Sequence, residues 1–438
     1  MAELPDERPR FFHGWVIVGA AFAVMFVSFG TAYSFAAFFH ALRDEFQATR
    51  GDVSLVFAIT GFLYFSLGAF SGPVADRLGP RRVILAGVVL IAAGLALASA
   101  AQHLWQIYLT YSLCVGVGVG FTYVPSVGTV QRWFSRRRGF ASGLAVAGIG
   151  AGTLVIPLLA AWVISGWGWR AAYLVLAALT LVVGVPAAWF IEHSPARRGL
   201  AADGDAPAVP GEAGEAGSAV LAPGFSVSEA VRERVFWLLY AATFATGIGL
   251  FIPFVHLAPY ARDHGLPDGF GTLLIGFIGA GSTFGRLFLG GFADRIGRRA
   301  ALVCVYCVMG LSLLGWLAAR DGWSLVTFAL VFGTAYGGFV ALVPALTTDY
   351  FGGRNAGGII GVLYTAAGVG ALFGPTLAGA MYDARDSYTI PILLAAATNA
   401  VAAGCIILLP SVDTWRRGRE SAPRIGTTDR PNEPARQQ

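Results

Sequence analysis

Twelve apolar segments, each long enough to cross a membrane, dominate this 438-residue chain and constrain its fold. A helix needs about 20 apolar residues to span the hydrocarbon core of a bilayer. Only 13% of the residues are charged, which is too few to cover a domain of this size in water. We therefore predict an all-α membrane protein with twelve transmembrane helices. The segments cover residues 15–40, 53–73, 83–101, 107–131, 140–163, 169–191, 236–260, 270–292, 300–319, 323–348, 357–381 and 388–410.

The basic residues, all 30 of them arginine, predict the topology. With the N-terminus inside, 23 arginines fall in inside segments and one, Arg286, falls within a span. Cytoplasmic loops carry an excess of basic residues, so both termini are expected in the cytoplasm. The compact halves, without an organelle signal, favour a bacterial inner membrane. The six outside arginines are Arg43, Arg50, Arg170, Arg262, Arg320 and Arg385. Tryptophans at span ends are expected to form an interfacial belt: Trp15, Trp105, Trp133, Trp169, Trp189 and Trp323.

A segment rich in Gly, Ala, Pro and acidic residues divides the twelve spans into six and six. Such a composition is typical of a flexible linker. Near its end, Ser226 and Glu229 have the spacing of a capping box that begins a short helix. The predicted units are a six-helix bundle in 1–191, a cytoplasmic linker in 192–235, a second six-helix bundle in 236–412 and a disordered cytoplasmic tail in 413–438.

The two halves repeat each other. The stretch "GPVADRLGPRR" begins at Gly72 and "GGFADRIGRR" begins at Gly290, an offset of 218 residues. The same offset joins other small residues and prolines. A duplicated helical bundle is typical of transporters, in which the substrate binds between the repeats. The other pairs are Gly143 with Gly361, Gly152 with Gly370, and Pro157 with Pro375.

These twin G-x-x-x-D-R-x-G motifs in a 6+6 arrangement resemble the major facilitator superfamily, over roughly residues 12–412. Within it, the chain is similar to the monocarboxylate transporter family and its bacterial relatives, and it resembles the related oxalate–formate exchangers. Four stretches carry that likeness: "FFHGWVIVGAAFAVMF", "GVGVGFTYVPSVGTVQRWFSRRRGFASGLAVAGIGAG", "FIPFVHLAPYARDHG" and "GSTFGRLFLGG". The resemblance implies two pseudo-symmetric bundles, transport by alternating access, and an arginine of the eighth span, here Arg286, that binds the substrate carboxylate.

Arg286 also stands out on physical grounds. An arginine near the membrane core costs at least ~2.5–3.5 kcal/mol on insertion scales. Helical side chains lean toward the helix N-terminus, so Arg286 leans toward the membrane centre rather than to the cytoplasmic surface. Its planar guanidinium suits a carboxylate. We predict that it binds substrate.

Other candidate substrate contacts are polar side chains at membrane depth. Ser282 lies one turn before Arg286 on the same helix face. It either orients Arg286, touches substrate, or only allows close helix packing. Tyr123 follows a GxGxG run, and its hydroxyl can bind a carboxylate. Tyr33, Tyr336 and Tyr364 are weaker candidates, since tyrosines in membrane cores are often hydrogen-bonded packing.

His256 and Asp263 are the predicted proton carriers, and the alternative for His256 is a hydrogen-bonded histidine at the membrane interface. His256 lies between Pro253 and Pro259, where an irregular helix often lines a cavity, and histidine titrates near neutral pH. The resemblance also places a histidine here, beside the substrate. Asp263 is expected either to relay protons, to pair with Arg286 in an outward-closed state, or to be a surface residue.

The chain departs from the family pattern at the proton-coupling positions. Many members have an aspartate where Ser282 lies, and a lysine in the first span, which this chain lacks. Oxalate–formate exchangers use a lysine in the eleventh span, and here no basic residue lies between Gly357 and Met381. A dicarboxylate substrate is therefore disfavoured.

The two loop motifs are expected to act as a cytoplasmic gate, through charge pairs between the halves that break when the inside opens. The alternative is that their arginines only set topology. The motif residues are Gly72, Asp76, Arg77, Arg81, Gly290, Asp294, Arg295 and Arg299.

The sequence thus predicts a carrier of a small organic monocarboxylate such as lactate or pyruvate, coupled to protons. Alternatives are a proton-independent carboxylate exchanger and a transporter-like sensor. An enzyme is disfavoured, because the histidines are scattered and no metal-ligand motif such as HExxH is present. We expect no cofactor, no metal and no nucleic-acid partner, and a monomer in the bilayer.

Overall fold

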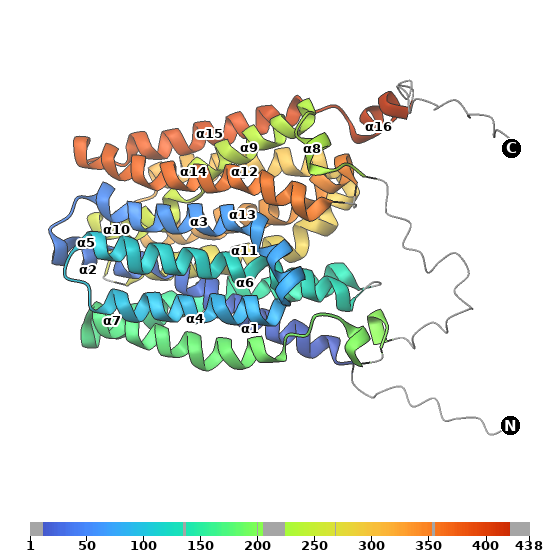
Figure 1. The fold of residues 1–438 in the computed structure, drawn as a ribbon. Helices are drawn as coiled ribbons and strands as arrows, with labels where there is room; N and C mark the ends of the chain where they lie inside the picture. The colour runs from blue at the N-terminus through green and yellow to red at the C-terminus, as the bar shows by residue number, and fades with distance from the viewer. Residues whose placement is uncertain are drawn as a thin grey trace, which may run out of the picture.

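The computed structural model describes residues 12–134, 137–198, 200–204, 224–267, 269–352 and 355–420, which are almost entirely helical. The long helices lie side by side in one bundle (Figure 1). We call the end where α1 begins and α15 ends the proximal end. The opposite end, where α2 leads into α3 and α14 into α15, is the distal end.

The first half of the bundle is built from α1 to α7. Its first span is broken between α1 and α2 at Ser34, and its fourth span joins α5, a π-helical turn and α6. The described segments are α1 (Gly14–Tyr33), α2 (Phe35–Phe46), α3 (Arg50–Leu78), α4 (Pro80–Ser99), α5 (Leu104–Ile107), the π-helical turn (Tyr108–Leu113), α6 (Cys114–Trp133) and α7 (Arg138–Phe190).

The helix α7 contains two spans rather than one. Gly168 has a φ of 79°, a left-handed value that glycine adopts without strain, and it interrupts the helical backbone. Gly152 lies against Phe26, while Gly184 lies against Val27, the next residue of α1. Two residues so far apart in α7 lie at the same height only if the chain folds back at Gly168. The predicted spans 140–163 and 169–191 are therefore both present.

The second half repeats the first. Its first span is again broken, between α9 and α10 at Phe251, just before Pro253, which cannot donate a backbone hydrogen bond. The described segments are α8 (Val227–Ala230), α9 (Arg234–Leu250), α10 (Ile252–Asp263), α11 (Phe270–Ile296), α12 (Arg298–Ala318), α13 (Gly322–Phe351), α14 (Ala356–Arg385), α15 (Thr389–Ile407) and α16 (Val412–Glu420).

Helix contacts follow the 218-residue offset seen in the sequence. Gly152 of α7 lies against the carbonyl of Phe26, and Gly370 of α14 lies against the carbonyl of Phe244, so both partners are offset by the same number. Glycine is required because a Cβ at either position would meet backbone. The duplication in the sequence is therefore also a duplication of helix packing.

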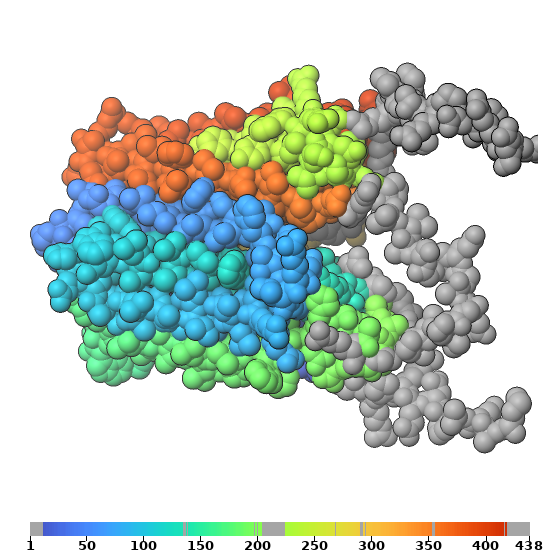
Figure 2. All heavy atoms as spheres, viewed as in Figure 1, coloured from blue at the N-terminus to red at the C-terminus, as the bar shows by residue number. Residues whose placement is uncertain are grey.

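The halves meet along two pairs of helices, α3 with α14 and α7 with α11. Figure 2 shows α3 in blue along the seam against the second half in orange. Small residues make the contacts: a Cβ on Gly61 would lie 3.2 Å from Ala371 Cβ, and a Cβ on Gly279 would lie 2.9 Å from the Gly150 carbonyl. Close, apolar helix crossings of this kind are usual in membranes.

Eleven helices in the described residues are long and apolar enough to cross a membrane, and the longest is the folded-back α7, so these residues hold twelve segments of membrane-spanning length. The capping box at Ser226 and Glu229 is confirmed, because the Glu229 amide donates to Ser226 Oγ and the Ser226 amide donates to Glu229. Residues 205–223 of the predicted linker and 421–438 of the predicted tail lie outside the described residues.

Candidate functional site

Arg286 lies where α11 faces the first half. Its Nη1 donates a 3.3 Å hydrogen bond to the carbonyl of Val146 on α7. Its Cζ lies 5.7 Å from the ring centre of Tyr336, a residue near the middle of α13. The guanidinium thus reaches toward the middle of the bundle, as the lean of helical side chains predicts. Its Nε is buried and makes no hydrogen bond within the described residues.

Three tyrosines from both halves form a chain of hydroxyl groups beside Arg286. Tyr33 Oη lies 3.0 Å from Tyr336 Oη and 3.5 Å from Tyr64 Oη. The Tyr33 ring also stacks on Phe254 at 4.8 Å. Because Tyr336 contacts the guanidinium, this chain connects Arg286 to α1 and α3 of the first half.

Two other predicted residues, Tyr123 and Tyr364, lie within electrostatic range of Arg286. The Tyr123 ring packs edge-on against Phe29 at 5.6 Å, and the Tyr364 hydroxyl is buried without a hydrogen-bond partner in the described part of the chain. The structure therefore brings the arginine and all four predicted tyrosines together. Arg286 Nε and the Tyr364 hydroxyl are hydrogen-bond donors of this cluster without a partner among the described residues.

Ser282 is 2% exposed, and its hydroxyl has no hydrogen-bond partner among the described residues. It does not bond to Arg286. Instead α13 approaches closely here, since a Cβ on Gly337 would meet the Ser282 carbonyl and lie 3.0 Å from the Arg286 amide. Close packing of a small residue is thus one observed role of Ser282, and a contact of its hydroxyl with substrate stays a prediction.

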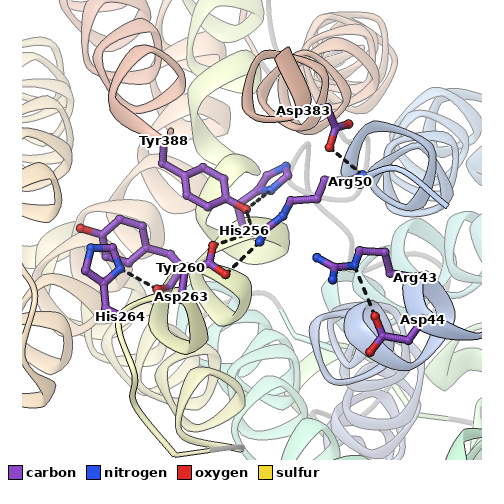
Figure 3. Close-up of polar contacts among 9 residues, drawn as sticks. All are labelled: Arg43, Asp44, Arg50, His256, Tyr260, Asp263, His264, Asp383 and Tyr388. Carbon is purple, nitrogen blue, oxygen red and sulfur yellow. Dashed lines mark hydrogen bonds and ion pairs between the residues drawn. The ribbon is translucent and has the colours of Figure 1, made fainter. Parts of the chain in front are cut away.

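A second polar cluster closes the distal end (Figure 3). Arg50, at the start of α3, makes a bidentate ion pair with Asp263 of α10, with both N–O distances 2.8 Å. Its Nη1 also donates to Tyr388 Oη at 2.6 Å. The guanidinium lies 3.8 Å from the ring centre of Tyr382. We call Arg50, Asp263, Asp383, Tyr388 and His256 the distal lock.

Asp383 of α14 completes the lock from the backbone side. Its carboxylate accepts from the Arg50 amide at 3.0 Å and from the Gly51 amide at 2.8 Å. Free amides and the positive end of the helix dipole favour an anion at a helix N-terminus. A carboxylate of the second half therefore caps a helix of the first half.

His256 belongs to this lock and is fully buried. Its Nε2 lies 2.8 Å from the Pro375 carbonyl, which can only accept, so Nε2 carries the hydrogen. Its Nδ1 lies 3.2 Å from Tyr388 Oη, and in the neutral imidazole it accepts from that hydroxyl. Hydrogen bonds thus connect Arg50 through Tyr388 to His256.

The alternative that Asp263 pairs with Arg286 is wrong for this conformation. Asp263 lies at the distal end of α10 and binds Arg50, whereas Arg286 lies in the proximal part of α11. His256 hydrogen-bonds to the lock, to Ser54 and to Pro375 and, among the described residues, not to Arg286, so its place beside the substrate stays a prediction.

The proximal motif residues contact their own halves. Arg132 pairs with Asp76, both in the first half, and Arg298 lies 2.7 Å from Asp349, both in the second. Arg81 donates to the Ile191 carbonyl at 3.1 Å, and its repeat mate Arg299 donates to the carbonyls of α15's end. Each arginine thus neutralises the negative end of the last helix of its own half.

Gating by pairs between the halves therefore stays a prediction, since each of these ion pairs and hydrogen bonds lies within one half. Arg77 and Arg295 are exposed. Gly72 packs against α6, where a Cβ on it would lie 3.3 Å from Val124. Gly290 and Asp294 lie in α11, and the surroundings of Gly290 and the side chain of Asp294 are not among the described features.

At the proximal end, burial of Glu192 is offset by Arg198, whose Nε and Nη2 both donate to it at 2.7 Å. This hydrogen bonding holds the pKa of the Glu192 carboxyl below its usual value. This pair lies within the start of the linker, and Trp133 of α6 joins that segment to the first half by donating to the Glu192 carbonyl at 3.0 Å.

Sequence reasoning missed Tyr64, Arg50, Asp383 and Tyr388. Two signals were available. Tyr64 is offset by 218 residues from Ser282, so the duplication places it at the equivalent position. Arg50 follows the N-cap Thr49 at a helix start, where a cation is unfavourable unless an anion compensates it.

Comparison with known proteins agrees with this architecture. The profile of the Major Facilitator Superfamily matches residues 21–330 and 268–435. Human monocarboxylate transporter 11 is 30% identical over 407 residues, covering 90% of this chain and 82% of that protein. Monocarboxylate transporter 13 of Bos taurus is 28% identical over 93% of this chain and 91% of its own length. An MFS-type transporter of Gibberella moniliformis is 29% identical over 88% and 86%. The chain therefore belongs to the Major Facilitator Superfamily and, within it, is a homologue of the monocarboxylate transporters.

Proposed function

We propose that the protein carries a small organic monocarboxylate across the membrane by alternating access, coupled to protons. The observation that carries this proposal is Arg286: a permanent cation at membrane depth, without an ion-pair partner in the described residues, beside tyrosine hydroxyls of both halves. One guanidinium and one carboxylate make a neutral pair, which crosses a closed state without a buried net charge.

In this proposal Arg286 holds the carboxylate, Tyr123, Tyr336 and Tyr364 orient it, and Tyr33 closes the site from the first half. Ser282 offers its free hydroxyl. The aromatic rings around the cluster, such as Phe29 and Phe254, suit the apolar body of lactate, pyruvate or a larger acid.

We further propose that His256 and Asp263 couple protons to closure of the distal end. A proton on His256 Nδ1 would remove the acceptor for Tyr388 and place a second cation near Arg50. A proton on Asp263 would remove the charge that Arg50 binds. A proton on either residue destabilises the closed arrangement of the lock. In this proposal the distal end therefore closes only after His256 and Asp263 have both released their protons.

The arginine distribution supports an orientation for this carrier. We propose that the proximal end is cytoplasmic and that the membrane is a bacterial inner membrane. Residues 192–235 would link the two moving halves, 1–191 and 236–412, and residues 413–438 would form a cytoplasmic tail. The carrier would work as a monomer. Motif residues at the proximal end would gate the opposite state.

The test is uptake of labelled lactate, pyruvate and phenylacetate by purified protein in liposomes, with and without an inward proton gradient. Uptake that the gradient stimulates supports the symporter. Uptake that is independent of the proton gradient and increases with the carboxylate concentration inside the liposomes would establish the exchanger instead. Saturable binding without any flux would establish a sensor.

A further inference from the structure

A cavity of about 490 Å³ lies at the proximal end of the first half, where α1 begins, α6 ends and α7 begins (Figure 1). None of its described lining residues belongs to the tyrosine chain or to the distal lock, and the proposed transport cycle does not involve it. Its volume falls in the range of about 300–1,000 Å³ that is usual for ligand sites. The described lining consists of Phe12, Trp15, Phe134, Arg137 and Asp203.

The cavity lies at the edge of the membrane-spanning region. The segments Gly14–Phe46 and Gly139–Phe190 begin beside it, and the segment Leu104–Trp133 ends there. Every described lining residue except Asp203 lies within two residues of one of these segment ends. Lipid headgroups occupy this depth, because the hydrocarbon core gives way to the polar interface where the spans end. A phospholipid headgroup is therefore within reach of the cavity.

Arg137 supplies a free positive charge to the lining. The residue is exposed, and its guanidinium makes no hydrogen bond or ion pair among the described residues. Asp203, the other charged residue of the described lining, already has an interaction of its own. The charge that this lining offers to a ligand is therefore positive. A guanidinium binds a phosphate through two parallel hydrogen bonds, for which its planar shape is suited.

The other described walls are aromatic rings. The Phe134 ring lies 5.3 Å from the Phe12 ring and 4.9 Å from the Trp15 ring, tilted against both. A free phosphate ester would leave these rings without contacts. Aromatic side chains at span ends prefer the level of the headgroups, where one side is apolar and the other is wet. The lining therefore favours a phosphate that carries an apolar group.

An exposed apolar strip on α7 leads from the cavity toward the hydrocarbon core. The Phe140 ring lies 6.2 Å from the Trp15 ring, and Phe140 is 64% exposed. Leu144 and Val155 are also exposed, and they lie within about 60° of Phe140 around the helix. An acyl chain attached to a phosphate in the cavity can follow this strip into the bilayer.

We propose that this cavity binds a phospholipid whose headgroup has a net negative charge. Its phosphate binds Arg137, its glycerol lies against the three rings, and one acyl chain follows the strip on α7. A headgroup with its own cation brings a second positive charge to the cavity, so zwitterionic lipids bind more weakly. The bound lipid joins the start of α1 to the turn between α6 and α7. Because it binds the folded protein, it raises the thermal stability.

The binding test uses trace tritiated phosphatidylglycerol with a photoactivatable acyl chain, in phosphatidylcholine vesicles that contain the full-length protein. Labelling should saturate, and unlabelled phosphatidylglycerol should compete. Arg137→Gln should weaken binding by about tenfold or more, because hydrogen bonds between charged groups are among the strong ones. Arg82→Gln is the matched control, since Arg82 is another exposed proximal arginine, outside the described lining. Glycerol 1-phosphate, a soluble fragment of the lipid, should not compete.

A second readout is the Tm in nanodiscs. Phosphatidylglycerol, compared with phosphatidylcholine, should raise the Tm of the unsubstituted protein and of Arg82→Gln. The rise should be lost in Arg137→Gln and in Trp15→Leu. Arg137→Gln changes an exposed side chain, so the test does not depend on whether Trp15→Leu folds.

Three results would overturn the proposal. The first is labelling that does not saturate. The second is equal binding by Arg137→Gln and Arg82→Gln, because general surface charge would then explain the attraction. The third is competition by glycerol 1-phosphate, because the site would then take a free phosphate ester rather than a lipid. None of these results depends on transport, so the proposed function is tested separately.

Discussion

Arg50 and Asp263, 213 residues apart and in opposite halves of the chain, meet in a bidentate ion pair at the distal end of the bundle. The Arg50 side chain is only 7% exposed and that of Asp263 is 27% exposed. A charge so deeply buried is tolerated because its partner, Tyr388 and the Tyr382 ring surround it. The closed distal end therefore depends on Asp263 remaining ionised.

Replacing Asp263 by Asn should open the distal end. The substitution leaves the Arg50 charge buried without its anion, a change that costs about 3–5 kcal/mol where a buried pair is broken. Spin labels at Gln47 and Arg385 would report a longer distance. Asp44→Asn is the matched control, because Asp44 pairs with Arg43 on the surface, with side chains 57% and 35% exposed. Surface pairs contribute about 0–1 kcal/mol, so that variant should stay closed. Equal distance distributions in the two variants would contradict the lock.

His256→Gln should impair proton coupling more than substrate affinity. His256 is hydrogen-bonded to the lock and not to Arg286, so the substrate KM should change little, while stimulation of uptake by an inward proton gradient should be lost. His264→Gln is the control, since that ring contacts the Tyr260 carbonyl in the distal turn. A large rise in KM with intact stimulation would instead place His256 at the substrate.

Tyr33→Phe should weaken the contact between the halves at the central site. It removes the hydroxyl that lies 3.0 Å from Tyr336 Oη, while the ring still stacks on Phe254. A buried hydrogen bond contributes about 0.5–1.5 kcal/mol, so the half-saturating substrate concentration should rise about two- to tenfold. Tyr306→Phe, whose hydroxyl makes no hydrogen bond in the described chain, should transport normally. Identical kinetics for the two variants would show that the Tyr33 hydroxyl does not contribute to the site.

Gly152→Ala should destabilise the protein. A Cβ there meets the backbone of Phe26, which cannot move aside as a side chain can. Overpacking of this kind costs about 1–3 kcal/mol. Thermal unfolding in detergent should show a lower Tm for Gly152→Ala and for its repeat mate Gly370→Ala. Gly404→Ala, where a Cβ meets open space, should have the Tm of the unsubstituted protein. The packing argument is refuted if Gly152→Ala and Gly370→Ala have the same Tm as Gly404→Ala.

Much of the fold follows from the sequence because bilayer spans are set by length and hydropathy, and the duplication is visible as a fixed offset. The predicted belt of tryptophans at span ends is wrong in part: Trp133 is fully buried and donates to the Glu192 carbonyl, and Trp169 is 6% exposed. A tryptophan at a helix end can face a neighbouring helix as readily as lipid, and hydropathy does not distinguish the two.

The proposed central site was predictable from Arg286, because a cation in a span without an ion-pair partner among the described residues has few structural explanations. The distal lock was not. Arg50, Asp263 and Asp383 all lie at helix ends, where charges are common, and their convergence depends on how the two halves dock. Topology reasoning assigned Arg50 to an outside loop, although it is a buried residue of α3.

The most direct test of the central claim is lactate and pyruvate uptake by Arg286→Ala and Arg286→Lys in liposomes, beside Arg320→Gln, which removes an exposed distal arginine. We predict that Arg286→Ala abolishes uptake, and that Arg286→Lys retains a small fraction because it keeps the charge and loses the planar fork. Arg320→Gln should transport as the unsubstituted protein does. Normal uptake by Arg286→Ala, with the protein folded, would contradict the account and make that arginine structural.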